Sequence, residues 1–277
     1  MLCEEKLFTD PAEDAAVLAH NEEMLLESHG SRIYGRILIP AAESAEERFP
    51  VALLLHGYPG LEANLDISQS LRQAGIAVAY FFYRGVWGSH GEYSFTHLIE
   101  DTEYVLQFLR DHAEAYQIDT KRMYLIGHSM GGFTALNVLA RGADVKGAVL
   151  MAPCDLSHRF EKEPDIYDLL VHVQDGGYFN TATETSLDED VRANAAEWRF
   201  TALAERIDET MPMHFIGGRD DTITPPQNHI LPMLQVLQDR GMNVSYTELP
   251  DGHSFPGHRI ALTKLIYRRI AQMEQGE

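Results

Sequence analysis

The chain has 277 residues, 45% of them hydrophobic and 23% charged, which is typical of a soluble globular protein and excludes wholesale disorder. Its formal net charge of −20 at pH 7 argues against nucleic acid and anionic membranes as partners, because like charges repel. We expect a cytoplasmic protein, since residues 1–14 hold no apolar run, no segment has the roughly 18 apolar residues of a spanning helix, and two cysteines cannot form a disulfide framework.

After an N-terminal extension over residues 1–21, the segment 22–40 has the pattern of a β-hairpin with His29-Gly30-Ser31 as its turn, and 41–50 is typical of an exposed loop. From residue 51 onward, apolar runs alternate with amphipathic patterns, which predicts an α/β fold with a mostly parallel, doubly wound sheet and the hairpin as its antiparallel edge. The predicted strands are 51–55, 76–82, 123–126, 145–151, 213–216 and 244–249, and the predicted helices are 61–74, 97–116, 129–140, 226–240 and 258–275.

The interval from Ala152 to Pro212 is too long for an ordinary crossover, so it predicts an insertion. We therefore divide the chain into a core of residues 22–152 and 212–277 and a cap segment of residues 153–211. Ligands bind at the carboxyl edge of such sheets, and we expect a small helical cap over that edge. The cap is the element that we expect to move or to dimerise, and a homodimer stays open. Its aromatic residues are Phe160, Tyr167, Tyr178, Phe179, Trp198 and Phe200.

The strongest functional signal is the sequence Gly-His-Ser-Met-Gly-Gly over residues 127–132, between a predicted strand and a predicted helix. This is the Gly-x-Ser-x-Gly pattern in the strand–turn–helix setting that its chemistry requires. The turn leaves no room for side chains at its flanking positions, and it lifts Ser129 clear at the start of the helix. Ser129 is therefore the predicted nucleophile.

A serine hydroxyl needs a base, and the base needs an orienting acid, in the chain order serine, acid, histidine. The loop after the predicted strand 213–216 holds two adjacent candidates for the acid, Asp220 and Asp221. We favour Asp221 because it stands three residues after Gly218 and four before Pro225, and Asp220 stays the alternative. After the last predicted strand, Asp251-Gly252-His253 places a glycine-flanked histidine in the final loop, so His253 is the predicted base.

Two backbone N–H groups are predicted to stabilise the oxyanion that forms when Ser129 attacks. One belongs to Met130, directly after the nucleophile, and the other to Tyr58 in the loop His56-Gly57-Tyr58-Pro59-Gly60 after the strand 51–55. Tyr58 is favoured over Pro59, which has no N–H group. We predict no metal and no cofactor, since no spaced cluster of cysteine and histidine is present.

These motifs, in this order and over most of the chain, resemble those of the α/β-hydrolase superfamily. Within it, the chain is similar to small bacterial carboxylesterases and to hydrolase domains related to prolyl oligopeptidase and dienelactone hydrolase. Tyr83-Arg84-Gly85 resembles the Arg-Gly loop after the fourth strand of many members, and the predicted cap is similar in place and size to that of cinnamoyl (feruloyl) esterases. The resemblance implies an α/β-hydrolase fold. Serine at position 129 argues against dienelactone hydrolase activity, which uses cysteine.

The predicted function is a serine hydrolase of the carboxylesterase type that cleaves a small-molecule ester through an acyl-enzyme. Two alternatives stay open. One is a peptidase or amidase that uses the same three residues on short substrates. The other is a non-catalytic, hydrolase-like binding protein. The sequence does not identify the acyl and alcohol groups of the substrate.

Overall fold

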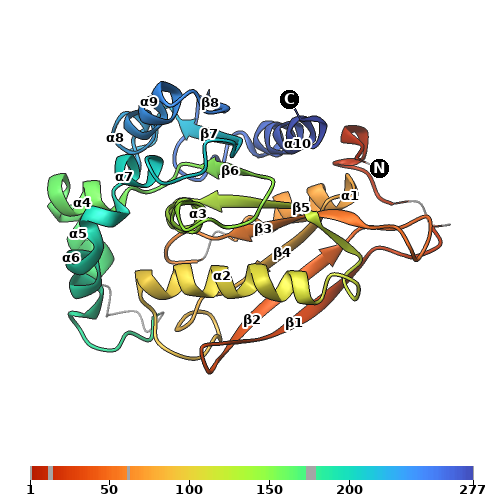
Figure 1. The fold of residues 1–277 in the computed structure, drawn as a ribbon, viewed down its shortest axis with the longest axis horizontal. Coiled ribbons are helices and arrows are strands. Elements are labelled where there is room, and N and C mark those ends of the chain that lie inside the picture. The colour runs from red at the N-terminus through yellow and green to blue at the C-terminus, as the bar shows by residue number, and fades with distance from the viewer. Residues whose placement is uncertain (1, 12–14, 61–62, 173–178, 277) are drawn as a thin grey trace.

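A computed structural model describes residues 2–11, 15–60, 63–172 and 179–276. Its centre is an 8-stranded sheet in the order β1-β2-β4-β3-β5-β6-β7-β8 (Figure 1). β1 and β2 form the predicted antiparallel hairpin, β2 pairs antiparallel with β4, and the pairs from β4 onward are parallel. The predicted α/β class and doubly wound sheet are confirmed. The strands are β1 (His20–Ser28), β2 (Ser31–Ile39), β3 (Phe49–Leu55), β4 (Ala77–Phe81), β5 (Ile118–His128), β6 (Gly147–Met151), β7 (Met213–Gly218) and β8 (Val244–Leu249).

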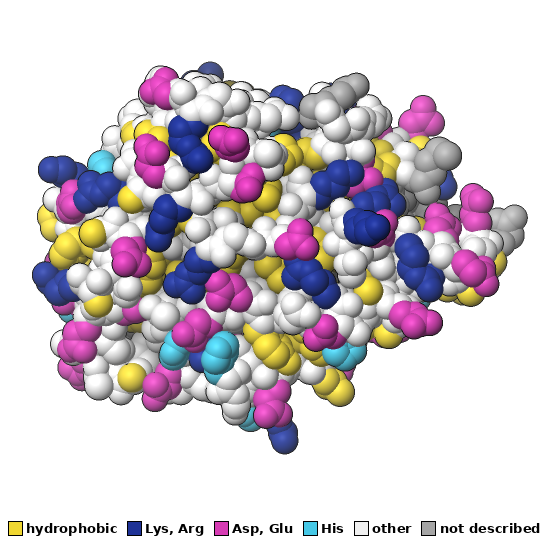
Figure 2. Space-filling model, viewed as in Figure 1, with side chains coloured by type: hydrophobic (Ala, Val, Ile, Leu, Met, Phe, Trp, Pro, Cys, Tyr) yellow, Lys and Arg dark blue, Asp and Glu magenta, His cyan; other side chains and the backbone are white. Residues whose placement is uncertain are grey.

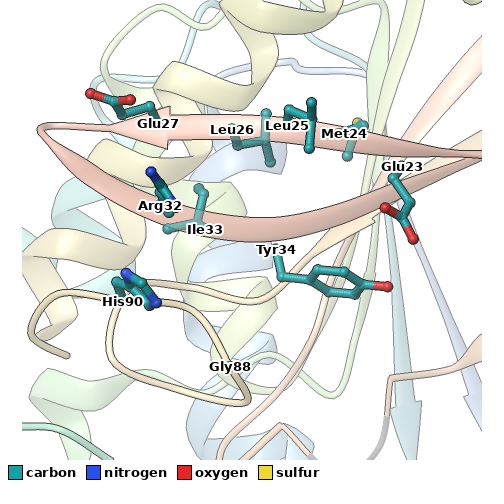
Figure 3. Close-up of a pocket in the computed structure, with 10 residues that line it drawn as sticks. All are labelled: Glu23, Met24, Leu25, Leu26, Glu27, Arg32, Ile33, Tyr34, Gly88 and His90. Atoms are coloured by element: carbon teal, nitrogen blue, oxygen red, sulfur yellow. The ribbon is translucent and has the colours of Figure 1, made fainter.

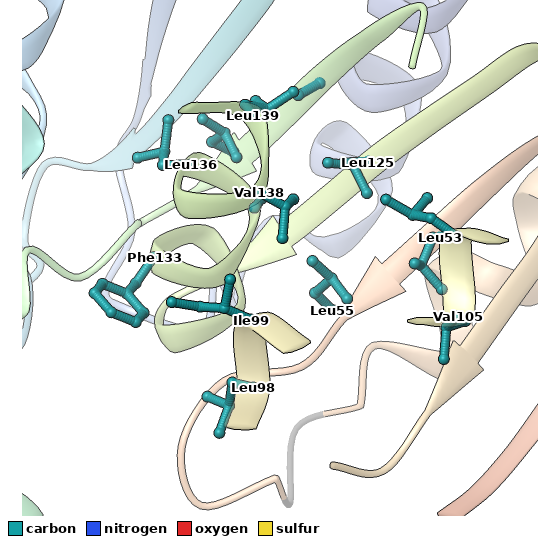
Figure 4. Close-up of a cluster of buried hydrophobic side chains, with 14 of the residues drawn as sticks. Leu53, Leu55, Leu98, Ile99, Val105, Leu125, Phe133, Leu136, Val138 and Leu139 are labelled. Carbon is teal, nitrogen blue, oxygen red and sulfur yellow. The ribbon is translucent and has the colours of Figure 1, made fainter. Parts of the chain in front are cut away.

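Helices cover both faces of the sheet, because the central strands are apolar on both sides. In β3, Leu53 and Leu55 belong to the core layer beneath the helices α2 (Phe95–Asp111) and α3 (Met130–Ala140), and Leu54 belongs to the opposite layer. Figure 4 shows the first layer, with strand leucines facing side chains of α2 and α3. The opposite layer lies under α1 (Leu65–Gln73) and α10 (Arg259–Gln275). Each buried leucine contributes about 1.5–3 kcal/mol relative to an exposed one, so this two-sided alternation fixes the register of β3.

Three predicted helices have different ends in the structure. α1 begins at Leu65, after Asn64 with its left-handed φ of 51°, and residues 61–62 of the predicted helix lie outside the described residues. α2 begins at Phe95, because the Ser94 side chain accepts the N–H of His97 as an N-cap, and it ends at Asp111. The predicted helix 226–240 is wrong as one unit. It is divided into α8 (Pro226–His229) and α9 (Leu231–Asp239), since Pro232 has no N–H to continue the helix and its ring crowds the preceding turn.

The insertion between β6 and β7 is helical, as predicted. In its described part the helices are α4 (Leu156–Lys162), α5 (Pro164–Val171), α6 (Ser186–Trp198) and α7 (Phe200–Ala204). Figure 1 shows α4, α5 and α6 gathered at one end of the sheet. Of the aromatic residues noted in the cap segment, Tyr167, Trp198 and Phe200 are buried, and Tyr178 lies outside the described residues. The limits of the cap as a separate unit stay a prediction.

The molecular surface carries both signs of charge. Figure 2 shows acidic and basic side chains interspersed over one face, so the acidic excess of the sequence does not form a single patch there. Within the described ranges, no helix combines the length and the apolar character needed to cross a membrane.

Candidate active site

Ser129 lies in a sharp turn between the end of β5 and the start of α3. Its backbone has φ 54° and ψ −114°, a strained conformation for a residue with a side chain that costs about 1–3 kcal/mol. The surroundings hold it there: its N–H donates to the Met151 carbonyl at 2.9 Å, and its carbonyl accepts the N–H of Cys154 at 3.1 Å. The turn therefore presents the Ser129 hydroxyl at the carboxyl end of the central strands.

The glycines around Ser129 are required by packing, as the sequence motif predicts. A Cβ on Gly127 would lie 2.5 Å from the Gly131 carbonyl oxygen, and a Cβ on Gly131 would collide with the carbonyl of Leu55. Both obstacles are backbone atoms, which cannot rotate away as a side chain can. α3 thus packs so closely on β3 and β5 that only glycine fits between them.

We expect Gly131→Ala to lower the free energy of unfolding by about 3 kcal/mol, because the added methyl group forces the start of α3 away from β3. Urea unfolding followed by circular dichroism measures this loss. Gly252→Ala is the matched control, since a Cβ at Gly252 meets no atom within 4 Å. Equal unfolding free energies for the two variants would contradict the close packing at Gly131.

Ser129, His253 and Asp221 form a continuous chain of hydrogen bonds. The Ser129 Oγ lies 2.9 Å from the His253 Nε2, and the His253 Nδ1 lies 2.8 Å from the Asp221 Oδ2. Because a carboxylate only accepts hydrogen bonds, the proton of the neutral ring is on Nδ1 and the Nε2 lone pair faces the serine hydroxyl. This is the geometry in which histidine can remove a proton from serine.

The Asp221 carboxylate accepts four hydrogen bonds, three from its own loop and one from His253. Oδ1 accepts the N–H groups of Ile223 at 2.8 Å and Thr224 at 2.9 Å, while Oδ2 accepts the Thr224 hydroxyl at 2.8 Å in addition to His253. Burial raises the pKa of Asp221, but the hydrogen bonds and charge of His253 and the bonds from Thr224 outweigh it and lower the pKa to about 2. Asp221 is therefore ionised at neutral pH. The sequence reasoning missed Thr224, although an aspartate in a loop often accepts the N–H groups that follow it in an Asx-turn.

Asp220, the alternative acid, points elsewhere. Its side chain is 64% exposed and lies 3.4 Å from the Arg219 guanidinium, while its backbone N–H donates to the Asp251 carbonyl at 3.0 Å. The structure therefore brings Asp221 to His253 and leaves Asp220 at the surface.

The loop with Tyr58 lies directly beside the serine. A Cβ on Gly57 would approach the Ser129 Cβ to 3.0 Å, which brings the backbone before Tyr58 against the nucleophile. Met130 is the first residue of α3, and the N–H groups in the first turn of a helix have no acceptor within that helix. Among the hydrogen bonds of the described residues, the N–H groups of Tyr58 and Met130 have no acceptor. Both predicted donors therefore belong to segments that adjoin Ser129, and their role towards an oxyanion stays a prediction.

Two buried histidines, His128 and His56, form hydrogen bonds with backbone carbonyls in the loops around Ser129. The His128 Nε2 donates to the His253 carbonyl at 3.0 Å and so ties the base loop to the nucleophile turn, a contact that the sequence reasoning missed. Burial, together with the charge of His253, lowers the pKa of His128 to about 3. The His56 Nδ1 donates to the Gly57 carbonyl at 2.8 Å, and burial lowers the pKa of His56 to about 4 despite that bond. Both rings are therefore neutral at pH 7.

The buried histidines predict that the protein loses stability in mild acid. Burial, with the charge of Arg269, also lowers the pKa of His214 to about 3. The unfolded chain binds protons on these rings below about pH 6.5, whereas the folded chain does so only near pH 3–4, so protons favour unfolding. The free energy of unfolding is highest above pH 6.5 and falls by up to about 1.4 kcal/mol per ring for each pH unit below it.

Urea unfolding at pH 7 and pH 5 measures this slope, and an unchanged transition would contradict it. His214→Gln is the control, because His214 lies near the start of β7, where its Nδ1 is 2.7 Å from the Ser245 Oγ. It has no hydrogen bond with Ser129, His253 or Asp221 among the described residues. The variant should lose one ring's share of the pH dependence.

The side chain of Tyr58 connects this loop to the cap segment. Its hydroxyl donates to the Leu170 carbonyl of α5 at 3.0 Å, and its ring stacks on Phe179 with centroids 4.8 Å apart. Tyr93 packs against the same Phe179 ring at 4.7 Å. Tyr58 and Tyr93 of the core and Phe179 of the cap segment therefore form one aromatic cluster that joins the two parts of the chain.

A separate surface hollow of about 460 Å³ lies on the β1–β2 hairpin (Figure 3). Its lining comes from residues 23–27 and 32–34 with Gly88 and His90, and it includes none of the predicted catalytic residues. Its lining holds no serine, cysteine or lysine side chain that could act as a nucleophile. In the described ranges, no three histidine, cysteine, aspartate or glutamate side chains are grouped so that they could hold a metal ion.

Comparisons with known proteins agree with this architecture. The family described as serine aminopeptidase, S33, matches residues 50–174. A protein of Escherichia coli (strain K12), "Uncharacterized protein YfhR", is 27% identical over 114 residues, which are 41% of this chain and 39% of that protein. The matched part thus spans about two fifths of this relative.

Two solved structures are similar over nearly the whole chain. The acylaminoacyl peptidase of Pyrococcus horikoshii has a TM-score of 0.70 at 18% identity, over 92% of this chain and 42% of that chain. Est1E from Butyrivibrio proteoclasticus has a TM-score of 0.68 at 15% identity, over 91% of this chain and 99% of that chain. At these identities the likenesses establish the fold.

Proposed function

We propose that the chain is a serine hydrolase of the α/β-hydrolase superfamily that cleaves carboxylic esters of small molecules, a proposal that the family match and the likeness to esterases and peptidases support. The observation that carries the proposal is the chain of hydrogen bonds from Ser129 through His253 to Asp221. Serine alone is a weak nucleophile, and the two partners supply the base and the charge that make it reactive.

In the proposed reaction, the Ser129 Oγ attacks the ester carbonyl carbon while its proton passes to the His253 Nε2. The N–H groups of Tyr58 and Met130 stabilise the negative charge that develops on the carbonyl oxygen. The ester C–O bond then breaks, and the alcohol leaves with the proton from His253. Water next attacks the acyl-enzyme and gives a proton to His253. The bond between the acyl carbon and the Ser129 Oγ then breaks, the Oγ takes that proton back from His253, and the acid is released. Asp221 stays ionised throughout and stabilises the imidazolium.

Labelling with a fluorophosphonate tests the proposal independently of the natural substrate. The reagent reacts with a serine only where a base activates it, so mass spectrometry should find the adduct on Ser129. An unlabelled protein would favour the non-catalytic binding alternative instead. A panel of p-nitrophenyl esters of increasing acyl length, with phenolic esters included, then defines the acyl preference.

A second candidate is a peptidase or amidase that acts on short substrates. The match to the serine aminopeptidase family and the likeness to acylaminoacyl peptidases support it. Esters and amides follow the same route through Ser129, but an amine is the poorer leaving group. Comparing kcat/KM for matched esters and aminoacyl amides separates the two candidates. A higher value for the amides would replace the ester proposal.

A further inference from the structure

Arg159, in the first helix of the cap segment, is a buried arginine that contacts two residues beside its own helix and one residue of the acid loop. Its side chain is 1% exposed. Nε donates to the Cys154 Sγ at 3.0 Å, Nη1 donates to the Glu163 Oε2 at 2.9 Å, and Nη2 donates to the Ile223 carbonyl. Because the guanidinium is planar and rigid, these three contacts define a single position for it.

The guanidinium stays charged in this buried place. Burial lowers the pKa of Arg159, but the contacts with Cys154 and the charges of Glu163 and Asp221 outweigh it, and the pKa lies above its ordinary value. Glu163 balances the charge and is itself fixed by the Asn228 amide at 3.2 Å. Taking two charges out of water is costly, and apolar residues would fill the same space at lower cost. The buried charge pair therefore indicates a role of Arg159 beyond packing.

The contact with Ile223 connects the cap segment to the predicted acid. Ile223 donates its N–H to the Asp221 Oδ1, and its carbonyl accepts from Arg159. The Ile223 side chain is 46% exposed, so packing contributes little to holding this residue. The backbone of the acid loop is therefore held here by hydrogen bonds, with Asp221 on one side and Arg159 on the other.

We propose that Arg159 is a positioning residue, which holds the acid loop through the Ile223 carbonyl and so aligns Asp221 with His253. The inference rests on the proposed function, because it assigns Asp221 the role of the acid. It also implies that the cap segment takes part in catalysis without contacting the reacting atoms: where α4 sits decides where the Asp221 carboxylate sits.

The test uses two variants, since removal of Arg159 alone leaves the largely buried Glu163 carboxylate without the arginine that balances its charge. Arg159→Met with Glu163→Gln removes both charges and keeps the volume. Arg159→Lys keeps the charge but cannot reach Glu163 and Ile223 together. For the double variant we expect kcat per active site to fall about 10- to 100-fold, as for a small misplacement of a catalytic group, with a smaller fall for the lysine variant.

Two readouts separate positioning from a loss of folded protein. Titration with a fluorophosphonate counts the active sites, so kcat refers to folded enzyme only. KM for short acyl esters should stay at the wild-type value, and the rate constant of phosphonylation should fall in parallel with kcat. The control is Arg199→Met, because Arg199 is also in the cap segment and pairs with Glu161, but its side chain is 39% exposed and, among the described residues, has no hydrogen bond or ion pair with the acid loop.

Folded variants with wild-type kcat and phosphonylation rates would overturn the inference, as would a change confined to KM. An Arg199→Met variant that loses as much as the double variant would also overturn it. These outcomes differ from a failure of the proposed function, in which the wild-type protein itself neither reacts with fluorophosphonate nor hydrolyses esters.

Discussion

Replacing Ser129 with alanine is expected to reduce kcat for p-nitrophenyl esters by about 10⁶-fold, because no other group can form the acyl-enzyme. Ser129 is the only hydroxyl that the described residues place on the His253 Nε2, at 2.9 Å. The measurement is steady-state ester hydrolysis, with product release followed by absorbance. The fluorophosphonate adduct should disappear together with the activity.

The control for this experiment is Ser44→Ala, since Ser44 lies in an exposed loop before β3. Circular dichroism should show that both variants keep the fold, because hydrogen bonds of the Ser129 backbone hold the turn and the substitution removes only the hydroxyl oxygen. A Ser129→Ala enzyme with wild-type turnover would remove the foundation of the proposed mechanism.

The meeting of Ser129 with His253 could be predicted from the sequence because the signals of both residues are local. The glycines around Ser129 are required by backbone contacts within a few residues and with the adjacent strand, and such contacts leave a short motif. His253 follows a predicted strand directly, which fixes the edge of the sheet where it lies. The strands of the core were predictable for a similar reason, since their apolar runs extend over both faces.

Other features depend on contacts between distant residues, and local patterns do not reveal them. Arg159 and Ile223 are far apart in the sequence, and an arginine in an amphipathic helix is usually expected at the surface. The single helix predicted over 226–240 shows the opposite error. There the apolar residues follow a continuous helical pattern, but Pro232 has no N–H group to donate to the preceding turn, so the helix is interrupted before Leu231.

The sequence favoured Asp221 but left Asp220 as an alternative, because adjacent residues in a loop point in directions that local patterns do not fix. Their side chains differ in every respect that matters for an acid. Asp221 is fully buried and bonded to His253, whereas Asp220 is 64% exposed. This difference yields a prediction on a matched pair of substitutions, in which the same chemical change is made one residue apart.

We expect Asp221→Asn to lower kcat by about 10⁴-fold and Asp220→Asn to leave it near the wild-type value. The N–H groups of Ile223 and Thr224 require an oxygen at the Oδ1 position, so the asparagine NH₂ must take the place of Oδ2 and face the His253 Nδ1. An NH₂ group there donates, which places the histidine proton on Nε2 and removes the lone pair that would accept the Ser129 proton.

The measurement is again kcat for p-nitrophenyl esters, per active site. A larger loss for Asp220→Asn than for Asp221→Asn would assign the acid to Asp220 and contradict the geometry. Equal, small losses would mean that His253 acts without a carboxylate partner. The inference on Arg159 provides an internal check, because a group that only aligns Asp221 cannot matter more than Asp221 itself. The loss for the double variant of Arg159 and Glu163 must therefore stay below the loss for Asp221→Asn.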